Sequence, residues 1–374
     1  MPILLAARYQ TTSEKNQVDQ STATAATSTV HDTSPPVQSS ATQPATPTDT
    51  SNAATTTEPA HDPEGVKPPD GFQWKLWAKE PLVADPVAFT VLNDGSLMVV
   101  ESERQDRGVE DNRYSPWWLM EDLRASTVEE RLAIYTKYAD KRVNGMDWYT
   151  KYADRVKHVT DKSGGGVADT AVNFSGELRE PLDGTAAGVL QVGDSVFVTC
   201  IPHLWRFQDK DGDGVAEVRE KMFTGFGVKT SLRGHDMHGL VLGMDGLLYW
   251  SIGDRGYNVR TKEGALLQDA ARGAVFRCEL DGSNLEVVFR GLRNPQELAF
   301  NDLGDLFTVD NNSDGGDKAR VEYLPDGGTL VGKCTIKLWR VTISADRGIK
   351  SMSGLCLIQP MWCNPRGSRR RSRI

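Results

Sequence analysis

The sequence contains few cysteines, and none of them stands in a Cys-x-x-Cys pair. The 374 residues include 5 cysteines, and without the paired spacing neither a zinc ribbon nor a covalently attached c-type haem is expected. We expect Cys200 and Cys278 to be buried free thiols, because each ends or interrupts an apolar strand pattern. No apolar run is long enough to cross a bilayer, and the formal net charge of −8 argues against a nucleic acid partner.

Large apolar side chains are also scarce in the first part of the chain. Residues 9–66 are rich in Thr, Ser, Ala, Pro and Gln, and such a segment cannot bury enough surface to offset its chain entropy. We therefore expect residues 1–66 to form a disordered tail. Residues 1–8 lack a basic region and resemble the last third of a truncated signal peptide, with an ordinary disordered start as the alternative. A signal peptide would indicate a periplasmic or extracellular protein.

What the chain does contain is a recurring strand–turn–strand pattern. Each copy has two apolar stretches that flank a turn with Asp or Gly, and the copies cover residues 89–101, 188–199, 241–250 and 298–310. The last three turns are roughly fifty to sixty residues apart, which is the period of a four-stranded propeller blade. Two outer strands are also expected, at 274–278 and 285–289. Residues 67–328 are thus predicted to be an all-β, partial β-propeller of about four blades.

Two regions depart from this pattern. Residues 103–175 are predicted to be a helical insert, with a helix over 127–135 and an N-cap at Ser126 or Thr127. Residues 329–374 contain no further copy and end in the basic run Arg366–Arg373. We expect this irregular tail to result from an altered reading frame or a truncation, and an anionic partner is the alternative.

The third copy brings a histidine and an aspartate together. His235 precedes the first strand of the hairpin, and Asp254 follows the second. Because a hairpin brings its two ends close together, we expect an imidazole oriented by a carboxylate. Such a pair is suited to act as a general base near neutral pH.

An acidic segment after residue 208 has the spacing of a twelve-residue calcium loop. The predicted ligands are side-chain oxygens and one main-chain carbonyl, from Asp209, Asp211, Asp213, Val215 and Glu220. The preceding residues 203–207 are predicted to be a strand, which does not fit a helix–loop–helix. A hairpin turn with solvated charges is therefore the alternative.

Two further polar segments adjoin the fourth copy. Arg293 and Asn294 precede its first strand, where a planar cation and an amide suit a ligand with carboxylates or quinone oxygens; a surface arginine is the alternative. The loop 310–317 follows its second strand and offers oxygens to a hard cation or to sugar hydroxyls. A common Asn/Asp/Gly turn is the other interpretation of this loop.

Four of these segments occur in the order seen in a known family. They are His235, Ile252–Gly256, the string Arg293-Asn294-Pro295-Gln296, and the loop that ends at Asp317. In this order they resemble the soluble quinoprotein glucose and sorbosone dehydrogenases. Residues 72–78 and the acidic loop are more similar to a larger bacterial, membrane-bound-dehydrogenase-like branch that is often fused to cytochrome c. The resemblance covers about residues 70–328.

The resemblance implies a fold and an activity. The fold would be a six-bladed quinoprotein-type propeller, incomplete here, that binds pyrroloquinoline quinone (PQQ) with calcium. The activity would be oxidation of a small sugar or aldehyde, with cytochrome c as electron acceptor. The family's basic cofactor ligands from later blades have no counterpart in this sequence, which is also compatible with an inactive, truncated domain.

The resemblance also implies individual roles. His235 would take a proton from the sugar hydroxyl, Asp254 would orient it, and Arg293 would act in catalysis and contact PQQ. The remaining implied contacts to the cofactor, the sugar and the calcium ion are those of Asn294, Asn311, Asn312, Ser313 and Asp317. A non-enzymatic, calcium-binding propeller that binds carbohydrate or protein is the alternative function. A sugar-lactone hydrolase would instead need a central calcium ringed by carboxylates.

Overall fold

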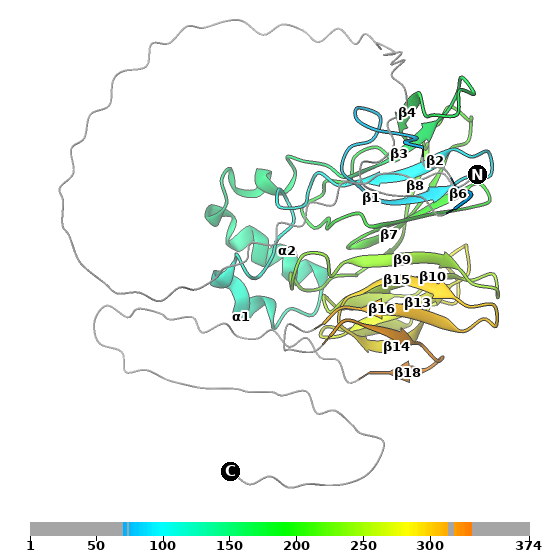
Figure 1. The fold of residues 1–374 in the computed structure, drawn as a ribbon. Coiled ribbons are helices and arrows are strands. Elements are labelled where there is room, and N and C mark those ends of the chain that lie inside the picture. Colours follow the sequence, from blue (N-terminus) through cyan, green and yellow to red (C-terminus); the bar gives the residue numbers. More distant parts are fainter. Residues whose placement is uncertain (1–69, 73–74, 313–317, 331–374) are drawn as a thin grey trace, which may run out of the picture. The chain divides into compact units, whose positions relative to one another are not determined.

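The computed structural model describes residues 70–72, 75–312 and 318–330, and β-strands make up most of their regular secondary structure (Figure 1). The predictions for residues 1–66, and for all but the first two residues of 329–374, lie outside this range. Among the described residues, no helix has the length and apolar character needed to span a membrane.

Four antiparallel sheets follow one another along the chain. The first contains β1 (Pro86–Val91), β2 (Leu97–Glu101), β3 (Arg155–Thr160) and β4 (Thr170–Asn173). The second contains β5 (Gly188–Val192), β6 (Ser195–Cys200), β7 (His203–Gln208) and β8 (Val218–Thr224). The third contains β9 (Met237–Leu242), β10 (Leu248–Ile252), β13 (Gly273–Cys278) and β14 (Glu286–Leu292), and β18 (Gly328–Thr329) pairs parallel with β14. The fourth contains β15 (Pro295–Phe300), β16 (Leu306–Asp310) and β17 (Arg320–Tyr323). A separate hairpin is formed by β11 (Tyr257–Arg260) and β12 (Leu266–Asp269).

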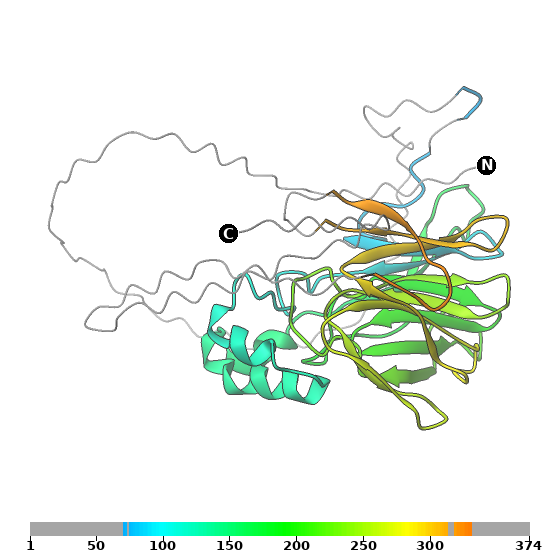
Figure 2. The same ribbon diagram turned by 90° about the horizontal axis from the view of Figure 1, so that it is seen from below.

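The sheets are arranged as the blades of a propeller. The first strand of each sheet contacts the first strand of the next: β1 contacts β5, β5 contacts β9, and β9 contacts β15. Figure 2 shows the strands gathered on one side and the helices of the insert on the other. The predicted all-β class and the four blades are therefore confirmed.

An apolar layer fills the space between each pair of neighbouring blades. Val100 and Val198 lie in the layer between the first two blades. The layer between the second and third blades contains Phe197 and Trp250, and the one between the third and fourth contains Val275 and Leu306. Since the central blades are covered on both faces, their inner strands are mainly apolar, and every residue of β6 and β10 is buried.

The insert is helical, but the predicted range of 103–175 extends too far. Its helices are η1 (Pro116–Trp118), α1 (Leu119–Asp122), α2 (Val128–Lys137), η2 (Ala139–Lys141) and η3 (Gly145–Tyr149). Residues 155–173 instead provide β3 and β4, which complete the first blade. Their strands are half exposed and alternate polar with apolar side chains, so they lack the apolar runs of the inner strands.

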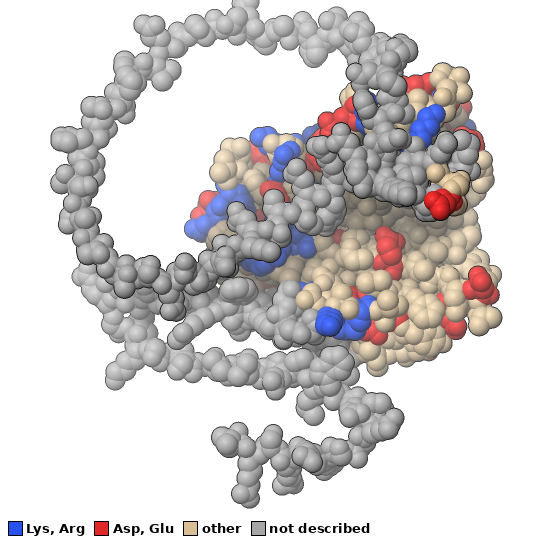
Figure 3. Space-filling view, viewed as in Figure 1, with Lys and Arg blue, Asp and Glu red and all other residues tan. Residues whose placement is uncertain are grey.

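The helix α2 begins as its sequence predicts. Thr127 is the N-cap, and its side chain accepts a hydrogen bond from the Glu130 main-chain N–H at 3.2 Å. Around it, Trp118, Tyr135 and Tyr149 form a small aromatic core of the insert. On the face shown in Figure 3, Lys and Arg side chains gather mainly over the insert, whereas the sheets show mostly uncharged side chains.

Candidate functional site

His235 and Asp254 meet at one end of the third blade. His235 lies just before β9 and Asp254 just after β10, and because these strands are antiparallel, both residues reach the same edge. The distance from His235 Nδ1 to Asp254 Oδ1 is 2.7 Å, and both side chains are buried. The contact predicted from the hairpin is therefore confirmed.

The carboxylate of Asp254 has further partners. The Ser231 hydroxyl donates to the same Oδ1 at 2.8 Å, and the Asp254 main-chain N–H donates to the Arg293 carbonyl at 2.7 Å. Burial alone would raise the pKa of Asp254. The charge and hydrogen bond of His235, the Ser231 hydroxyl and the charge of Arg293 outweigh burial and hold this pKa below its usual value. Asp254 is thus kept as an anion next to the imidazole.

Gly253 allows the main chains of two blades to come close. A Cβ atom at this position would lie 2.7 Å from the His235 carbonyl oxygen and 2.9 Å from the Arg293 carbonyl oxygen. Any side chain here would push these segments apart. The glycine therefore sets the distance between the His–Asp pair and the Arg293 segment.

Arg293 and Asn294 lie between β14 and β15 and are fixed by Asp310. The buried Asp310 carboxylate accepts the Asn294 main-chain N–H at 2.7 Å and the Arg293 N–H at 3.2 Å. Asn294 is buried, and Gln296 donates both to the Asn294 side chain at 2.8 Å and to the Gly234 carbonyl at 3.2 Å. The structure thus brings Arg293 and Asn294 to the same edge as His235.

The other predicted ligands near the fourth blade are less fully described. Asn311 and Asn312 directly follow β16 and are half-buried. Ser313 and Asp317 lie outside the described residues. In the sequence, Asp310 is the first residue of this polar loop, and its role in fixing the 293–294 main chain could not be predicted from that position.

The insert also contributes to this end of the blades. Asp122 of α1 is fully buried and accepts the Thr230 main-chain N–H at 2.7 Å, and it lies 3.4 Å from the Ser231 N–H. Asp111 accepts the Arg233 N–H at 3.2 Å. The segment that supplies Ser231 and His235 is therefore fastened to the insert. Sequence reasoning missed these carboxylates, because their partners are more than a hundred residues away.

The acidic loop joins β7 to β8 as a hairpin connection. Asp209, Asp211, Asp213 and Glu217 offer carboxylate oxygens that all lie within 4.8 Å of one another. Val215 is in the same connection, and its N–H donates to Asp213 at 2.8 Å. Glu220 is not brought to this group, because it lies on β8 and pairs with Arg206 at 2.5 Å. Glu217 was not among the predicted ligands, although it lies in the same connection.

A shallow, open pocket of about 430 Å³ is found elsewhere in the structure. It is lined by Ser126, Gln268, Asp269, Ala270 and Arg272, none of which is a predicted site residue. His235 itself is only 3% exposed.

The fold and the site together define a β-propeller protein with a buried His–Asp pair at one end of its blades. The chain belongs to the family described as "Domain of unknown function (DUF7133)", which matches residues 58–337. A search of curated proteins found no match.

Several solved structures are similar to the chain. The PQQ-bound aldose sugar dehydrogenase of Streptomyces coelicolor is 16% identical, with 66% of this chain and 61% of that chain covered and a TM-score of 0.37. A putative glucose dehydrogenase of Thermus thermophilus is 17% identical, with 67% of this chain and 64% of that chain covered and a TM-score of 0.37. The PQQ domain of a pyranose dehydrogenase from Coprinopsis cinerea is 12% identical, with 67% of this chain and 55% of that chain covered and a TM-score of 0.36. The chain spans roughly three fifths of the length of these structures.

Proposed function

We propose that residues 67–328 form a PQQ-dependent dehydrogenase-like domain that oxidises a small sugar or aldehyde. The observation that carries this proposal is the buried contact of 2.7 Å between His235 Nδ1 and Asp254 Oδ1. The resemblance of the surrounding segments to the quinoprotein sugar dehydrogenases supplies the reaction class.

The His–Asp contact determines which imidazole nitrogen acts as the base. Asp254 is an anion and accepts a hydrogen bond, so it favours the tautomer of His235 with the proton on Nδ1. The lone pair is then on Nε2, which takes the proton from the substrate hydroxyl. The imidazolium that forms is stabilised by the adjacent carboxylate.

The residues beside this pair fit an anionic quinone cofactor. The Arg293 guanidinium lies close enough to Asp254 to lower the pKa of that carboxylate, and Asn294 offers a buried amide at the same edge. We propose that Arg293, Asn294 and Asn311 bind PQQ or substrate, together with Asp317 beyond the described residues. When bound, PQQ supplies a two-electron, hydride-accepting group, which no amino-acid side chain provides.

We further propose that calcium binds to the β7–β8 connection. Asp209, Asp211 and Asp213 would be ligands with the Val215 carbonyl, and Glu217 is a better placed fourth carboxylate than Glu220. A second calcium near the cofactor would use the carbonyls of Asn312 and Ser313. The acidic connection also favours the second candidate function, a non-enzymatic, calcium-binding propeller that binds carbohydrate or protein.

The cellular setting follows from the same proposal. A quinoprotein that depends on calcium suits the periplasm or the extracellular space, where we expect this protein to act. Its electrons would pass to a cytochrome c, as in the bacterial branch that it resembles.

The test is dye-linked oxidation of aldoses and aldehydes after addition of PQQ and calcium. We expect quinone absorbance to appear with the protein and the dye to be reduced. His235→Ala should lower kcat by about 10²- to 10⁴-fold while PQQ absorbance is kept. His158→Ala is the control, since His158 lies on β3 and contacts Ser96 at 3.0 Å.

Full dye reduction by His235→Ala would show that the mechanism is wrong. If the protein takes up neither PQQ nor electrons but calcium raises its melting temperature, the non-enzymatic alternative is supported instead.

A further inference from the structure

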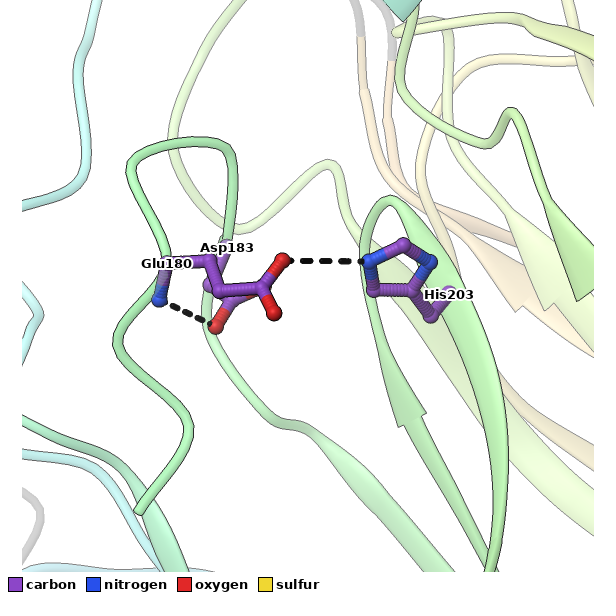
Figure 4. Close-up of side chains that lie close together, drawn as sticks. All are labelled: Glu180, Asp183 and His203. Atoms are coloured by element: carbon purple, nitrogen blue, oxygen red, sulfur yellow. Dashed lines mark hydrogen bonds and ion pairs between the residues drawn. The ribbon is translucent and has the colours of Figure 1, made fainter. Parts of the chain in front are cut away.

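A second group of metal-ligand side chains lies in the second blade, apart from the His235–Asp254 pair. Glu180 and Asp183 come from the connection between β4 and β5, and His203 is the first residue of β7. One ligand atom of each lies within 4.8 Å of the others. Figure 4 shows both carboxylates on the side of the imidazole ring that carries Nε2.

His203 presents an unsatisfied nitrogen to this group. The side chain is 5% exposed, and its Nδ1 lies 2.9 Å from the Thr224 hydroxyl. Within the described part of the chain, Nε2 has no hydrogen-bond partner. The nearest carboxylate oxygen of Glu180 is 3.7 Å away, which is too long for a hydrogen bond.

Asp183 has an unsatisfied oxygen in the same place. Asp183 is 3% exposed. One of its carboxylate oxygens, Oδ2, accepts the Glu180 main-chain N–H at 2.7 Å. The other, Oδ1, has no hydrogen-bond partner among the described residues. Buried polar atoms are rarely left without a partner, because desolvation then costs free energy that nothing repays. Two such atoms in one cluster point to a ligand that bonds both.

The set of donor atoms selects the class of ligand. One imidazole nitrogen and two carboxylates suit Zn²⁺ and related first-row divalent cations, whereas Ca²⁺ and Mg²⁺ prefer oxygen atoms alone. The contact of His203 Nδ1 with Thr224 fixes the ring so that Nε2 is free to coordinate. Because Glu180 is exposed, a further coordination position would face solvent.

The neighbouring cations do not occupy the site. Arg104 donates to the main-chain carbonyls of Asp183 at 2.7 Å and of Glu180 at 3.3 Å, so it fixes the connection and leaves the carboxylates available. Lys221 pairs with the Glu180 carboxylate at 2.8 Å. This lysine is partly exposed and can turn into solvent when a metal ion binds.

We propose that Glu180, Asp183 and His203 bind a first-row divalent transition-metal cation such as Zn²⁺. The ion would join the connection before β5 to the start of β7 and so stabilise the second blade. This site is separate from the acidic β7–β8 connection and does not depend on the proposed dehydrogenase activity.

The test is titration of the chelator-treated, full-length protein with Zn²⁺, followed by calorimetry and by thermal unfolding. We expect one equivalent to bind and the melting temperature to rise. Glu180→Gln should weaken binding about tenfold or more, because one anionic ligand is lost while the exposed side chain is hardly needed for folding. Asp211→Asn is the matched control and should bind Zn²⁺ as the unchanged protein does.

The binding results of the two variants distinguish the proposed site from the acidic connection. Absence of Zn²⁺ binding, or equal binding by Glu180→Gln, would overturn the proposal. Loss of binding in Asp211→Asn would place the ion in the acidic connection instead. A rise in melting temperature with Ca²⁺ that equals the rise with Zn²⁺ and is lost in Glu180→Gln would show that the class of cation is wrong.

Discussion

At the scale of single residues, the His235–Asp254 pair depends on groups that do not touch a substrate. Ser231 donates to the same oxygen as His235, and the main chain of Arg293 holds Asp254 from the other side. Gly253 lets the main chains at His235 and Arg293 lie closer to it than any side chain at this position would allow. The orientation of the imidazole therefore comes from three separate stretches of chain.

The first prediction concerns Asp254 and pH. The folded-state pKa of Asp254 lies below its usual value, so the ionised Asp254 carboxylate stabilises the fold above about pH 4. That stabilisation is lost as the pH falls through the folded-state pKa. We expect Asp254→Asn to lower the free energy of unfolding by about 1–3 kcal/mol near neutral pH, because an anionic hydrogen-bond acceptor is replaced by a neutral one.

Urea unfolding of both proteins between pH 3 and pH 7 measures this difference. It should begin to shrink below about pH 4, where the carboxyl group of the unfolded wild-type chain takes up a proton, and disappear as the pH falls through the lower folded-state pKa. Asp140→Asn is the control, since Asp140 makes an exposed surface pair with Lys141. A difference that stays constant over the whole range would contradict the role assigned to the Asp254 charge.

At the scale of elements, the helical insert and the third blade are joined through buried carboxylates. Asp122 is the last residue of α1, and its partners, Thr230 and Ser231, precede His235 in the chain. Asp122 also accepts the side-chain amide of Asn112 at 2.7 Å. A change in the insert should therefore reach the His–Asp pair through Ser231.

The second prediction is that Asp122→Ala loosens the segment that carries Ser231. Removing the carboxylate leaves buried N–H donors without an acceptor, which should cost about 2–4 kcal/mol of unfolding free energy. Hydrogen exchange of the Thr230 amide should accelerate, and its rate is the direct measurement.

A neighbouring carboxylate provides the control for this prediction. Glu121, also on α1, pairs with Lys137 of α2 at 2.6 Å on the surface, so Glu121→Ala should change the unfolding free energy far less than Asp122→Ala does. If Asp122→Ala leaves exchange of the Thr230 amide unchanged, the insert does not hold this segment in place.

The elements differ in how far the sequence predicts them. The inner strands were predicted because apolar residues dominate them and packing buries every position, as in β2 and β10. The outer strands β3 and β4 were assigned to the insert because their half-exposed positions carry Lys, His, Thr and Asn. The His–Asp contact was predictable since a hairpin is local. The Asp122 and Asp310 contacts depend on long-range packing that no short pattern encodes.

At the scale of the whole described region, the first and fourth blades differ from the two between them. Val87, Phe89 and Val91 alternate along β1 on an exposed face, while Ala88 and Leu92 pack toward the second blade. In the fourth blade, Val309, Val321 and Tyr323 are likewise exposed. Each of these blades therefore presents a row of apolar side chains to solvent, of the kind that favours association.

The last prediction follows from these two faces. The double substitution Phe89→Thr and Val321→Thr should reduce self-association, because threonine keeps the preference for strands and removes apolar surface. Losing roughly 2 kcal/mol of apolar burial from a contact shifts the association midpoint by more than tenfold in concentration. Sedimentation velocity over a range of protein concentrations measures this shift.

Val143→Thr is the control, since Val143 is an exposed residue of the insert, away from both faces. If the double variant associates at the same concentrations as the wild type, these faces do not drive association. An unchanged unfolding free energy, within about 0.5 kcal/mol, would show that the blades themselves remain intact.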